Sequence, residues 1–469
     1  MQSIADSVFA AVEHIFTAVQ SFVWGVPMVL ALFAAGLYLT VGGGFVQFRH
    51  FPLICRKTAG SLFARPARDE SRPAQGLSRE KKISPFRAMS AALAGTLGTG
   101  NILGVATAIA LGGPGAVFWM WLSAALGMMT KFAEVALAVH YRVPDGKGGW
   151  LGGPMFTIRR GLPDAFAPLA GVFAVCCALA SFGIGNMAQS GALSSQLDAA
   201  FGAPKWACGA VTAVVVLAII LGGIHRISGF TQIFVPVLTV AYMLFGVAAI
   251  LLSIDKLPAA LRDIFAGAFG LKAAAGGGIG YTLAQAMRFG VARGVFTNEA
   301  GMGSAPIAHA SADTDSAVEQ GFWGAFEVFL DTLVICTITA LVILTSRAYS
   351  PAAPPQGMTA DAFAGIFGDA GRSFVALAVA FFAVLTIVSW SHYACSCLTF
   401  LFPRNASRAV FVYRVLYGGA VYVGAVARFD FVWTVSDAFN GLMAIPNLIS
   451  VLLLSRVVFR LLREYKTRE

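Results

Sequence analysis

The residues with the clearest potential for binding chemistry lie in a short glycine-rich segment, Gly95-Thr-Leu-Gly-Thr-Gly-Asn101. Four of the ten residues from 95 to 104 are glycine, and each costs about 1 kcal/mol of helix propensity relative to alanine. A helix that breaks here exposes backbone carbonyls that suit a cation and backbone amides that suit a carboxylate. The alternative is close helix packing through small residues. Packing does not account for Asn101 or the two threonines, so we favour a binding site.

A second polar interruption falls between residues 278 and 308. The glycine-rich stretch Gly276–Tyr281 opens it, and Arg288, Arg293 and Glu299 lie within it. Ionisable side chains inside an apolar span usually face a cavity or each other. Two interpretations remain open: Arg293 and Glu299 form an internal ion pair or gate, or both lie at the cytoplasmic interface with their side chains reaching water.

Polar residues in two other apolar stretches could contribute to the same site. The amide of Gln189 could bind a substrate, or it could bond to a neighbouring helix. Thr386, Ser389 and Trp390 share one face of a predicted helix at 373–401. Their hydroxyl oxygens suit a hard monovalent cation, and the Trp390 ring could line a small pocket or simply pack in the bundle.

Two pairs of charged residues follow helical spacing. Lys131 and Glu134 are three residues apart and are most simply a local pair. Glu327 and Asp331 are four residues apart and could form a relay for a cation or a proton, or could meet the arginines of the second interruption.

These residues belong to a chain that water alone cannot solvate. Hydrophobic residues make up 58% of the 469 and charged residues 12%, about half the charged share of a soluble domain, and the mean hydropathy is +0.76. The histidines are scattered without an adjacent nucleophile and base, so we expect no enzyme. The seven cysteines mostly lie in apolar runs and are expected to pack there rather than bind metal.

Windows of about 20 apolar residues predict eleven membrane spans. They are 22–46, 86–112, 114–140, 166–191, 206–224, 230–253, 278–308, 321–346, 373–401, 408–427 and 431–457. The first twenty residues are apolar at helical spacing and predict a short amphipathic helix on the membrane surface.

Positive charge predicts the orientation. Lys and Arg gather at 49–87, at 141–160 and in the tail after 455, and eleven spans put all three on one face. The rule that positive loops stay inside then places the N-terminus outside and the C-terminus in the cytoplasm. The net charge of +10 is therefore a topology signal, and we expect no nucleic-acid partner.

Spans two to eleven divide into two sets of five with opposite orientation, and each set begins with an interrupted helix. This predicts an inverted repeat. We divide the chain into an N-terminal segment with the first span and the basic loop (1–85), a first repeat (86–253), a second repeat (254–457) and a cytoplasmic tail (458–469).

Taken together, these segments resemble the alanine or glycine:cation symporter family of bacterial transporters. The similar stretches are Gly95–Trp121, Lys131–Glu134, Gly152–Met155, Phe289–Gly301 and Gly441–Asn447. The resemblance implies an all-α, leucine-transporter-like fold of five plus five helices with one preceding helix. It also implies sodium-driven uptake of alanine or glycine across the inner membrane by alternating access.

Two other functions remain to be considered. A transporter of this kind could be coupled to protons instead of sodium, and a channel is the alternative outside the transporters. The expected partners are sodium, a small amino acid and the bilayer, and no obligate protein partner is evident.

The resemblance also assigns site residues. The implied substrate contacts are Thr99, Gly100, Asn101, Gln189, Phe296 and Trp390. The implied sodium contacts are Gly98, Asn101, Thr386 and Ser389. One departure follows Trp390, where Ser-His-Tyr-Ala-Cys395 replaces an aromatic run that ends in an acidic residue. This change bears on substrate size and on coupling.

Overall fold

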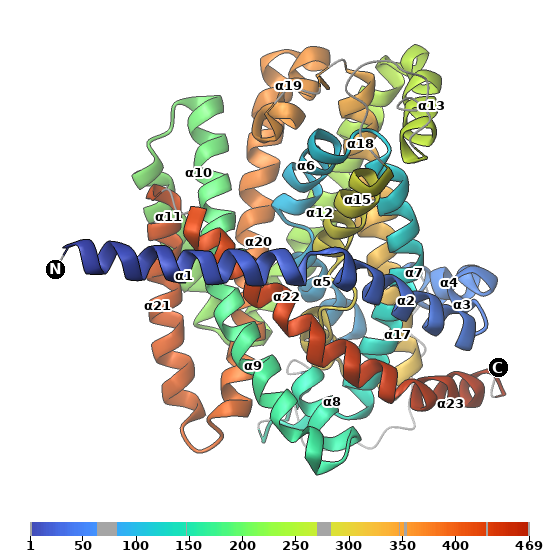
Figure 1. The fold of residues 1–469 in the computed structure, drawn as a ribbon. Coiled ribbons are helices and arrows are strands. Elements are labelled where there is room, and N and C mark those ends of the chain that lie inside the picture. Colours follow the sequence, from blue (N-terminus) through green and yellow to red (C-terminus); the bar gives the residue numbers. More distant parts are fainter. Residues whose placement is uncertain are drawn as a thin grey trace.

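The computed structural model is almost entirely helical, and it describes residues 2–62, 82–146, 148–269, 283–346, 348–350, 354–427 and 430–467. Most of its long helices, such as α7, α20 and α21, run side by side along one axis (Figure 1). A two-residue antiparallel hairpin, β1 (Val143–Pro144) with β2 (Trp150–Leu151), pairs Val143 with Leu151.

Among the described residues, the N-terminal half contains α-helices, three 3-10 turns (η1, η3 and η4) and the π-helical segment η5. In order they are α1 (Gln2–Val23), α2 (Val26–Gly42), α3 (Val46–Arg49), α4 (Phe51–Lys57), η1 (Ala59–Leu62), α5 (Pro85–Thr96), η3 (Thr99–Asn101), α6 (Leu103–Gly112), α7 (Ala116–His140), α8 (Pro154–Gly161), η4 (Asp164–Phe166), α9 (Ala167–Phe182), η5 (Gly183–Met187), α10 (Ala188–Phe201), α11 (Lys205–Ile220) and α12 (Gly223–Leu252).

The C-terminal half contains α13 (Leu257–Ala268), α15 (Leu283–Asn298), α16 (Ala305–His309), α17 (Ala317–Val328), the π-helical segment η7 (Phe329–Cys336), α18 (Thr337–Thr345), α19 (Pro355–Phe367), α20 (Asp369–Leu401), α21 (Ala406–Val426), α22 (Asp430–Leu453) and α23 (Ser455–Lys466). The glycine-rich stretch Gly276–Tyr281 lies outside the described residues.

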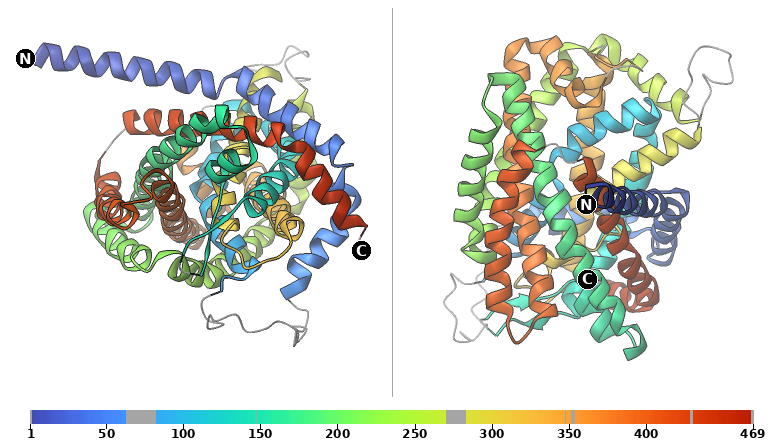
Figure 2. Two further views of the ribbon diagram at one scale, coloured as in Figure 1. Left: turned by 90° about the horizontal axis from the view of Figure 1, so that it is seen from below. Right: turned by 60° about the vertical axis from the view of Figure 1, so that its left-hand side comes forward.

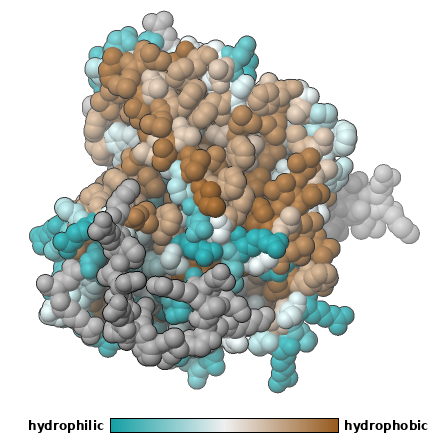
Figure 3. All heavy atoms as spheres, turned by 180° about the vertical axis from the view of Figure 1, so that it is seen from behind, coloured by the Kyte–Doolittle hydropathy of each residue, from teal (hydrophilic) through white to brown (hydrophobic). Residues whose placement is uncertain are grey.

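Among the described residues, eight helical segments are long and apolar enough to cross a membrane. The shorter apolar helix α11 and the two interrupted helices, α5–α6 and α15–α16, bring them to the eleven spans that the sequence predicts. The outer faces of the bundle are apolar: Val214 is 68% exposed and Leu244 is 67% exposed. Figure 3 shows apolar side chains over most of the upper part of one face, with hydrophilic ones gathered mainly toward its lower end. An apolar exterior of this extent is stable only in lipid.

Helix α1 does not lie along one end of the bundle, as a surface helix would. It crosses the bundle at about half its height, and its first turns extend beyond it (Figures 1 and 2). Its second half packs against α22, where Gln20 Nε2 donates to Asp437 Oδ2 at 2.9 Å. Trp24, just after α1, donates from Nε1 to the Asp437 carbonyl at 3.0 Å.

The first predicted helix break is present between α5 and α6. Leu97 leaves the helical region with ψ of 80°, and Gly98 is extended. Glycine at residue 98 is required by packing as well, because a Cβ there would lie 2.6 Å from Thr386 Oγ1.

The second break separates α15 from α16. Glu299 adopts a φ of 53°, which is rare for a residue with a side chain, and Gly301 and Gly303 follow with φ of 94° and 83°. Helix α6 packs against α15, and α5 packs against α16. The two breaks therefore meet inside the bundle.

Candidate functional site

A small closed cavity lies where the two helix breaks meet. Its volume is about 20 Å³, room for one or two water molecules. Six of the predicted site residues line it: Gly98, Gly100, Gln189, Phe296, Thr386 and Trp390. The other lining residues are Gly95, Thr96, Ile184, Glu299 and Asn440. The cavity thus collects residues from α5, η3, α9–α10, α15, α20 and α22.

The backbone of the first break is held by two side-chain amides. Gln189 Oε1 accepts from the Thr99 amide at 3.3 Å, while Gln189 Nε2 donates to the Ile184 carbonyl. Asn101 Oδ1 accepts from the Gly98 amide at 3.3 Å. Because Gln189 follows the π-helical segment η5 directly, the irregular helix sets the position of its amide.

Asn101 is not among the lining residues. Its Nδ2 donates to Asp331 Oδ1 at 2.7 Å, so the side chain links the break to the π-helical segment η7. Thr99 contributes its backbone amide rather than a lining side chain. The structure therefore gives both residues a part in shaping the break.

Thr386 and Ser389 on α20 face carbonyl oxygens near the end of α5. Thr386 Oγ1 donates to Ala94 O at 3.2 Å, and Ser389 Oγ donates to Ala91 O at 2.8 Å. Ser389 does not line the cavity, but it lies one turn from Thr386 on the same face. These four oxygens, beside the negative end of a helix, are a donor set that suits sodium.

Glu299 is a site residue that the sequence prediction missed. It is buried and is the one ionisable residue lining the cavity, as far as the described residues go. Trp390 Nε1 donates to Glu299 Oε1 at 3.1 Å, and the Ser304 hydroxyl donates to Oε2. Its place in the second break, two residues before a glycine, was the available signal. The sequence alone leaves Glu299 open between an ion pair and an interfacial position.

Phe296 also lines a second, larger cavity of about 210 Å³. We call this the vestibule; it is lined by Gln20, Ser21, Trp24, Arg288, Phe289, Ala292, Arg293, Phe296 and Asp437. Arg293 lies over the Phe296 ring, 5.3 Å from its centre. The arginines of α15 thus line the vestibule while Glu299 lines the central cavity. Among the described residues Arg293 and Glu299 form no ion pair, and Glu299 is buried rather than interfacial.

A buried charged cluster lies beside the cavity. Lys131 Nζ is 3.7 Å from Glu327 Oε1, and His309 Nε2 is 2.8 Å from Glu327 Oε2. Thr96 connects this cluster to the first break, because its hydroxyl donates to Glu327 Oε1 at 3.3 Å.

Two expectations about charged pairs are corrected here. Lys131 pairs across the bundle with Glu327, and Glu134 instead accepts a hydrogen bond from Asn447. Glu327 and Asp331 do not meet the arginines of α15. Glu327 binds Lys131 and His309, and Asp331 binds Asn101.

The unusual segment after Trp390 still contacts the first break. The Tyr393 hydroxyl donates to the Ala92 carbonyl at 3.4 Å, and its ring lies 5.6 Å from that of Trp390. A Cβ at Gly95 would lie 2.5 Å from the Tyr393 hydroxyl oxygen. Tyr393 therefore occupies space that a side chain at residue 95 would need.

Known proteins are similar to this chain both in sequence and in fold. The sodium:alanine symporter family is similar to residues 9–469 of the chain. The sodium/alanine symporter AgcS of Methanococcus maripaludis is 41% identical over 446 residues, 94% of each chain. The probable sodium/glutamine symporter GlnT of Bacillus subtilis is 38% identical over 455 residues, 97% of this chain and 90% of GlnT. Among solved structures, MhsT in complex with L-phenylalanine aligns with a TM-score of 0.56 and 14% identity, over 82% of this chain and 99% of that one. MhsT has the leucine-transporter fold, which confirms the fold class.

Proposed function

Because this chain belongs to the sodium:alanine symporter family, we propose that it carries a small neutral amino acid, alanine or glycine, into the cell together with sodium. The family and its members are transporters and not enzymes. We further propose that the protein lies in the inner membrane with its N-terminus outside and its C-terminus in the cytoplasm.

The observation that carries this proposal is the polarity of the central cavity. One wall is the first break, where a substrate carboxylate would replace Gln189 Oε1 as the acceptor of the Thr99 amide. Another wall carries the carboxylate of Glu299, which suits an ammonium group. A zwitterionic amino acid would match both ends. The side chains of Ile184, Phe296 and Trp390 leave room between them for a small substituent only.

Sodium would bind beside the amino acid, between α5 and α20. We propose that Thr386 and Ser389 turn their hydroxyl oxygens to the ion together with the carbonyls of Ala91 and Ala94, with which they now hydrogen bond. Sodium would then tie the end of α5 to α20. This coupling would order the break that also binds the amino acid, so that each ligand favours binding of the other.

Transport requires the cavity to open to each side in turn. At about 20 Å³ the cavity is too small for alanine, so it must expand when the substrate enters. In alternating access it opens to one side of the membrane at a time. Phe296 lies between the cavity and the vestibule on one side. On the other side, α16 and α5 pack together. Movement of these parts in turn would give alternating access.

Proton coupling is the alternative that a specific observation favours. The buried cluster of Lys131, Glu327 and His309 contains groups that bind protons, and Thr96 connects it to the first break. A proton on this cluster would change the charge next to the substrate site.

Uptake by sealed membrane vesicles distinguishes the two mechanisms. Vesicles with this protein should accumulate labelled alanine or glycine when an inward sodium gradient is imposed at equal pH, and should not do so with a proton gradient in sodium-free medium. Competition by unlabelled amino acids of increasing size measures selectivity, including for glutamine. Uptake that follows the proton gradient alone would overturn sodium coupling, and a lack of any saturable uptake would overturn the assigned substrate class.

A further inference from the structure

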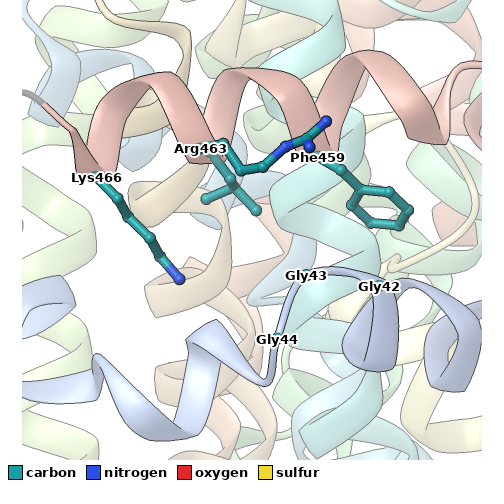
Figure 4. A pocket seen from close by; sticks show the side chains of 7 residues that line it. Gly42, Gly43, Gly44, Phe459, Arg463 and Lys466 are labelled. Atoms are coloured by element: carbon teal, nitrogen blue, oxygen red, sulfur yellow. The ribbon is translucent and has the colours of Figure 1, made fainter.

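The largest cavity that we describe lies away from the transport site, between the end of α2 and helix α23. Its volume is about 430 Å³, and it is lined by Gly42, Gly43, Gly44, Phe459, Leu462, Arg463 and Lys466. Figure 4 shows Lys466 extending from α23 into the space beside the Gly42–Gly44 segment. We propose that this cavity binds the headgroup of an anionic phospholipid.

The glycine run keeps the cavity open. At Gly42 a Cβ would lie 2.2 Å from the Phe459 ring, so only glycine lets α23 approach this closely. Gly44 has a φ of 68° and nothing within 4 Å of a Cβ position. Helix α23 is fixed here by Tyr38, whose hydroxyl lies 3.1 Å from Ser455 Oγ and whose ring lies 6.0 Å from that of Phe459.

The charge of the cavity selects an anion. Both ionisable lining residues, Arg463 and Lys466, are basic and exposed. Among the described residues, no carboxylate lies within ion-pair distance of either side chain. Two cations facing one space repel each other, so an anionic group placed between them would be stabilised.

The surface leading to the cavity selects an amphiphile over a free anion. Leu30, Leu37 and Val41 lie on one exposed stripe of α2, and they are 52%, 47% and 57% exposed. This stripe ends at Gly42, and Phe45 and Phe48 continue the exposed apolar surface on the other side of the glycines. Acyl chains would cover the stripe while the phosphate meets Arg463 and Lys466. Basic pockets beside apolar helices are known to bind lipid headgroups in this way.

Lipid binding to the purified full-length protein tests this proposal without depending on transport. Phosphatidylglycerol, phosphatidylcholine and inorganic phosphate would be titrated separately, with native mass spectrometry and thermal unfolding as readouts. The variant is Arg463→Gln with Lys466→Gln. The matched control, Arg456→Gln with Arg460→Gln, removes the same charge from exposed positions of the same helix outside the cavity.

We expect phosphatidylglycerol to bind the parent and the control, and to bind the cavity variant about 25-fold more weakly. Each basic side chain near an anionic headgroup contributes about a fivefold effect. Phosphatidylcholine should bind all three proteins equally weakly. Equal loss in the control would show a general charge effect and overturn the site. Binding of inorganic phosphate as tight as that of phosphatidylglycerol would overturn the lipid as its occupant.

Discussion

Glu299 supplies the carboxylate of the central cavity, and neighbouring side chains hold it in place by hydrogen bonds. Trp390 and Ser304 each donate to a different carboxylate oxygen. Its φ of 53° stores strain of about 1–3 kcal/mol, which the fold must offset. Such strain at a residue that lines a cavity is typical of a binding role.

We expect Glu299→Gln to reduce uptake by about 10- to 100-fold, because a hydrogen bond to a charged group contributes about 1.5–3 kcal/mol. The glutamine oxygen can still accept from Trp390, so the change removes charge and little else. Labelled alanine uptake at low concentration measures the effect, normalised to the amount of inserted protein. Uptake within about twofold of the parent would contradict an ammonium contact at Glu299.

Gly95 and Tyr393 form a steric pair that can be tested by rescue. Gly95→Ala would place a Cβ 2.5 Å from the Tyr393 hydroxyl oxygen. We expect this variant to lose most uptake because α5 must shift at the break. Adding Tyr393→Phe removes the colliding oxygen and should restore part of the uptake.

The control for that pair is Gly419→Ala, where a Cβ would have nothing within 4 Å. This variant should transport normally. If the double variant recovered no uptake, the contact between residues 95 and 393 would not be what limits Gly95→Ala.

The sequence predicted some residues that line the central cavity, but it did not predict contacts between residues far apart in the chain. Gln189, Thr386 and Trp390 drew attention as polar or aromatic groups in apolar spans, and the resemblance added Phe296; all four line the central cavity. The ligand role of Asn101 stays a prediction, and its Nδ2 donates to Asp331. That partner is 230 residues away in the chain, and no local pattern indicates such a contact. The pairing of Lys131 with Glu327 was missed for the same reason.

At the scale of elements, the sodium site that we propose lies between α5 and α20. We expect Thr386→Val, which keeps the shape and removes the hydroxyl, to raise the sodium concentration for half-maximal uptake about tenfold, the effect of about 1.4 kcal/mol. Initial rates of alanine uptake over a range of sodium concentrations measure this. Ser391→Ala is the matched control, because the Ser391 hydroxyl donates to Val388 O within its own helix. An unchanged sodium dependence in Thr386→Val would exclude Thr386 as a ligand.

The short helix α16 is held from outside the bundle by one arginine. Arg142 donates to the carbonyls of Ala312 and Thr314 at 2.5 and 2.6 Å, just after α16 ends. Its guanidinium also stacks on Trp150 of the β-hairpin, 4.2 Å from the ring centre. This contact closes the side of the protein that we expect to be cytoplasmic.

We expect Arg142→Ala to open this side more often. A thiol reagent should then modify a cysteine placed at the buried Ser311 about tenfold faster, since one charged hydrogen bond contributes about 1.5 kcal/mol. Arg142→Lys should give an intermediate rate, because lysine keeps the charge but lacks the planar donors that reach two carbonyls. Equal rates in all three proteins would show that Arg142 does not control opening.

Both helix breaks could be predicted because glycine runs and charged residues interrupt otherwise apolar segments. The π-helical segments η5 (Gly183–Met187) and η7 (Phe329–Cys336) could not, since glycines or a single aspartate in an apolar helix do not indicate a wider helical turn. Their irregular hydrogen bonding depends on packing, and they position Gln189 and Asp331. The placement of α1 against α22 was also not predicted, because hydrophobic spacing alone does not distinguish a membrane surface from a neighbouring helix.

At the scale of the whole molecule, hydrophobicity and charge predicted a helical membrane protein of eleven spans, and the family resemblance implied the leucine-transporter-like fold. The division into repeats at 86–253 and 254–457 and the orientation of the termini stay predictions. We expect a tag at the C-terminus to resist protease in spheroplasts with an intact inner membrane and a tag at the N-terminus to be cleaved. Permeabilised cells provide the control in which both are cleaved. The opposite pattern would invert the topology and place the lipid site at the outer surface.

Phe296 lines both the central cavity and the vestibule. The two ends of the pathway should therefore open at different rates. A change in one side-chain rotamer is faster than the shift of packed helices such as α5 and α16, which takes microseconds to milliseconds. Exchange of the amino acid with the vestibule would therefore reach equilibrium many times before the opposite side opens once. The slow helical step would then limit net uptake, while exchange of labelled for unlabelled amino acid at the vestibule side would run much faster.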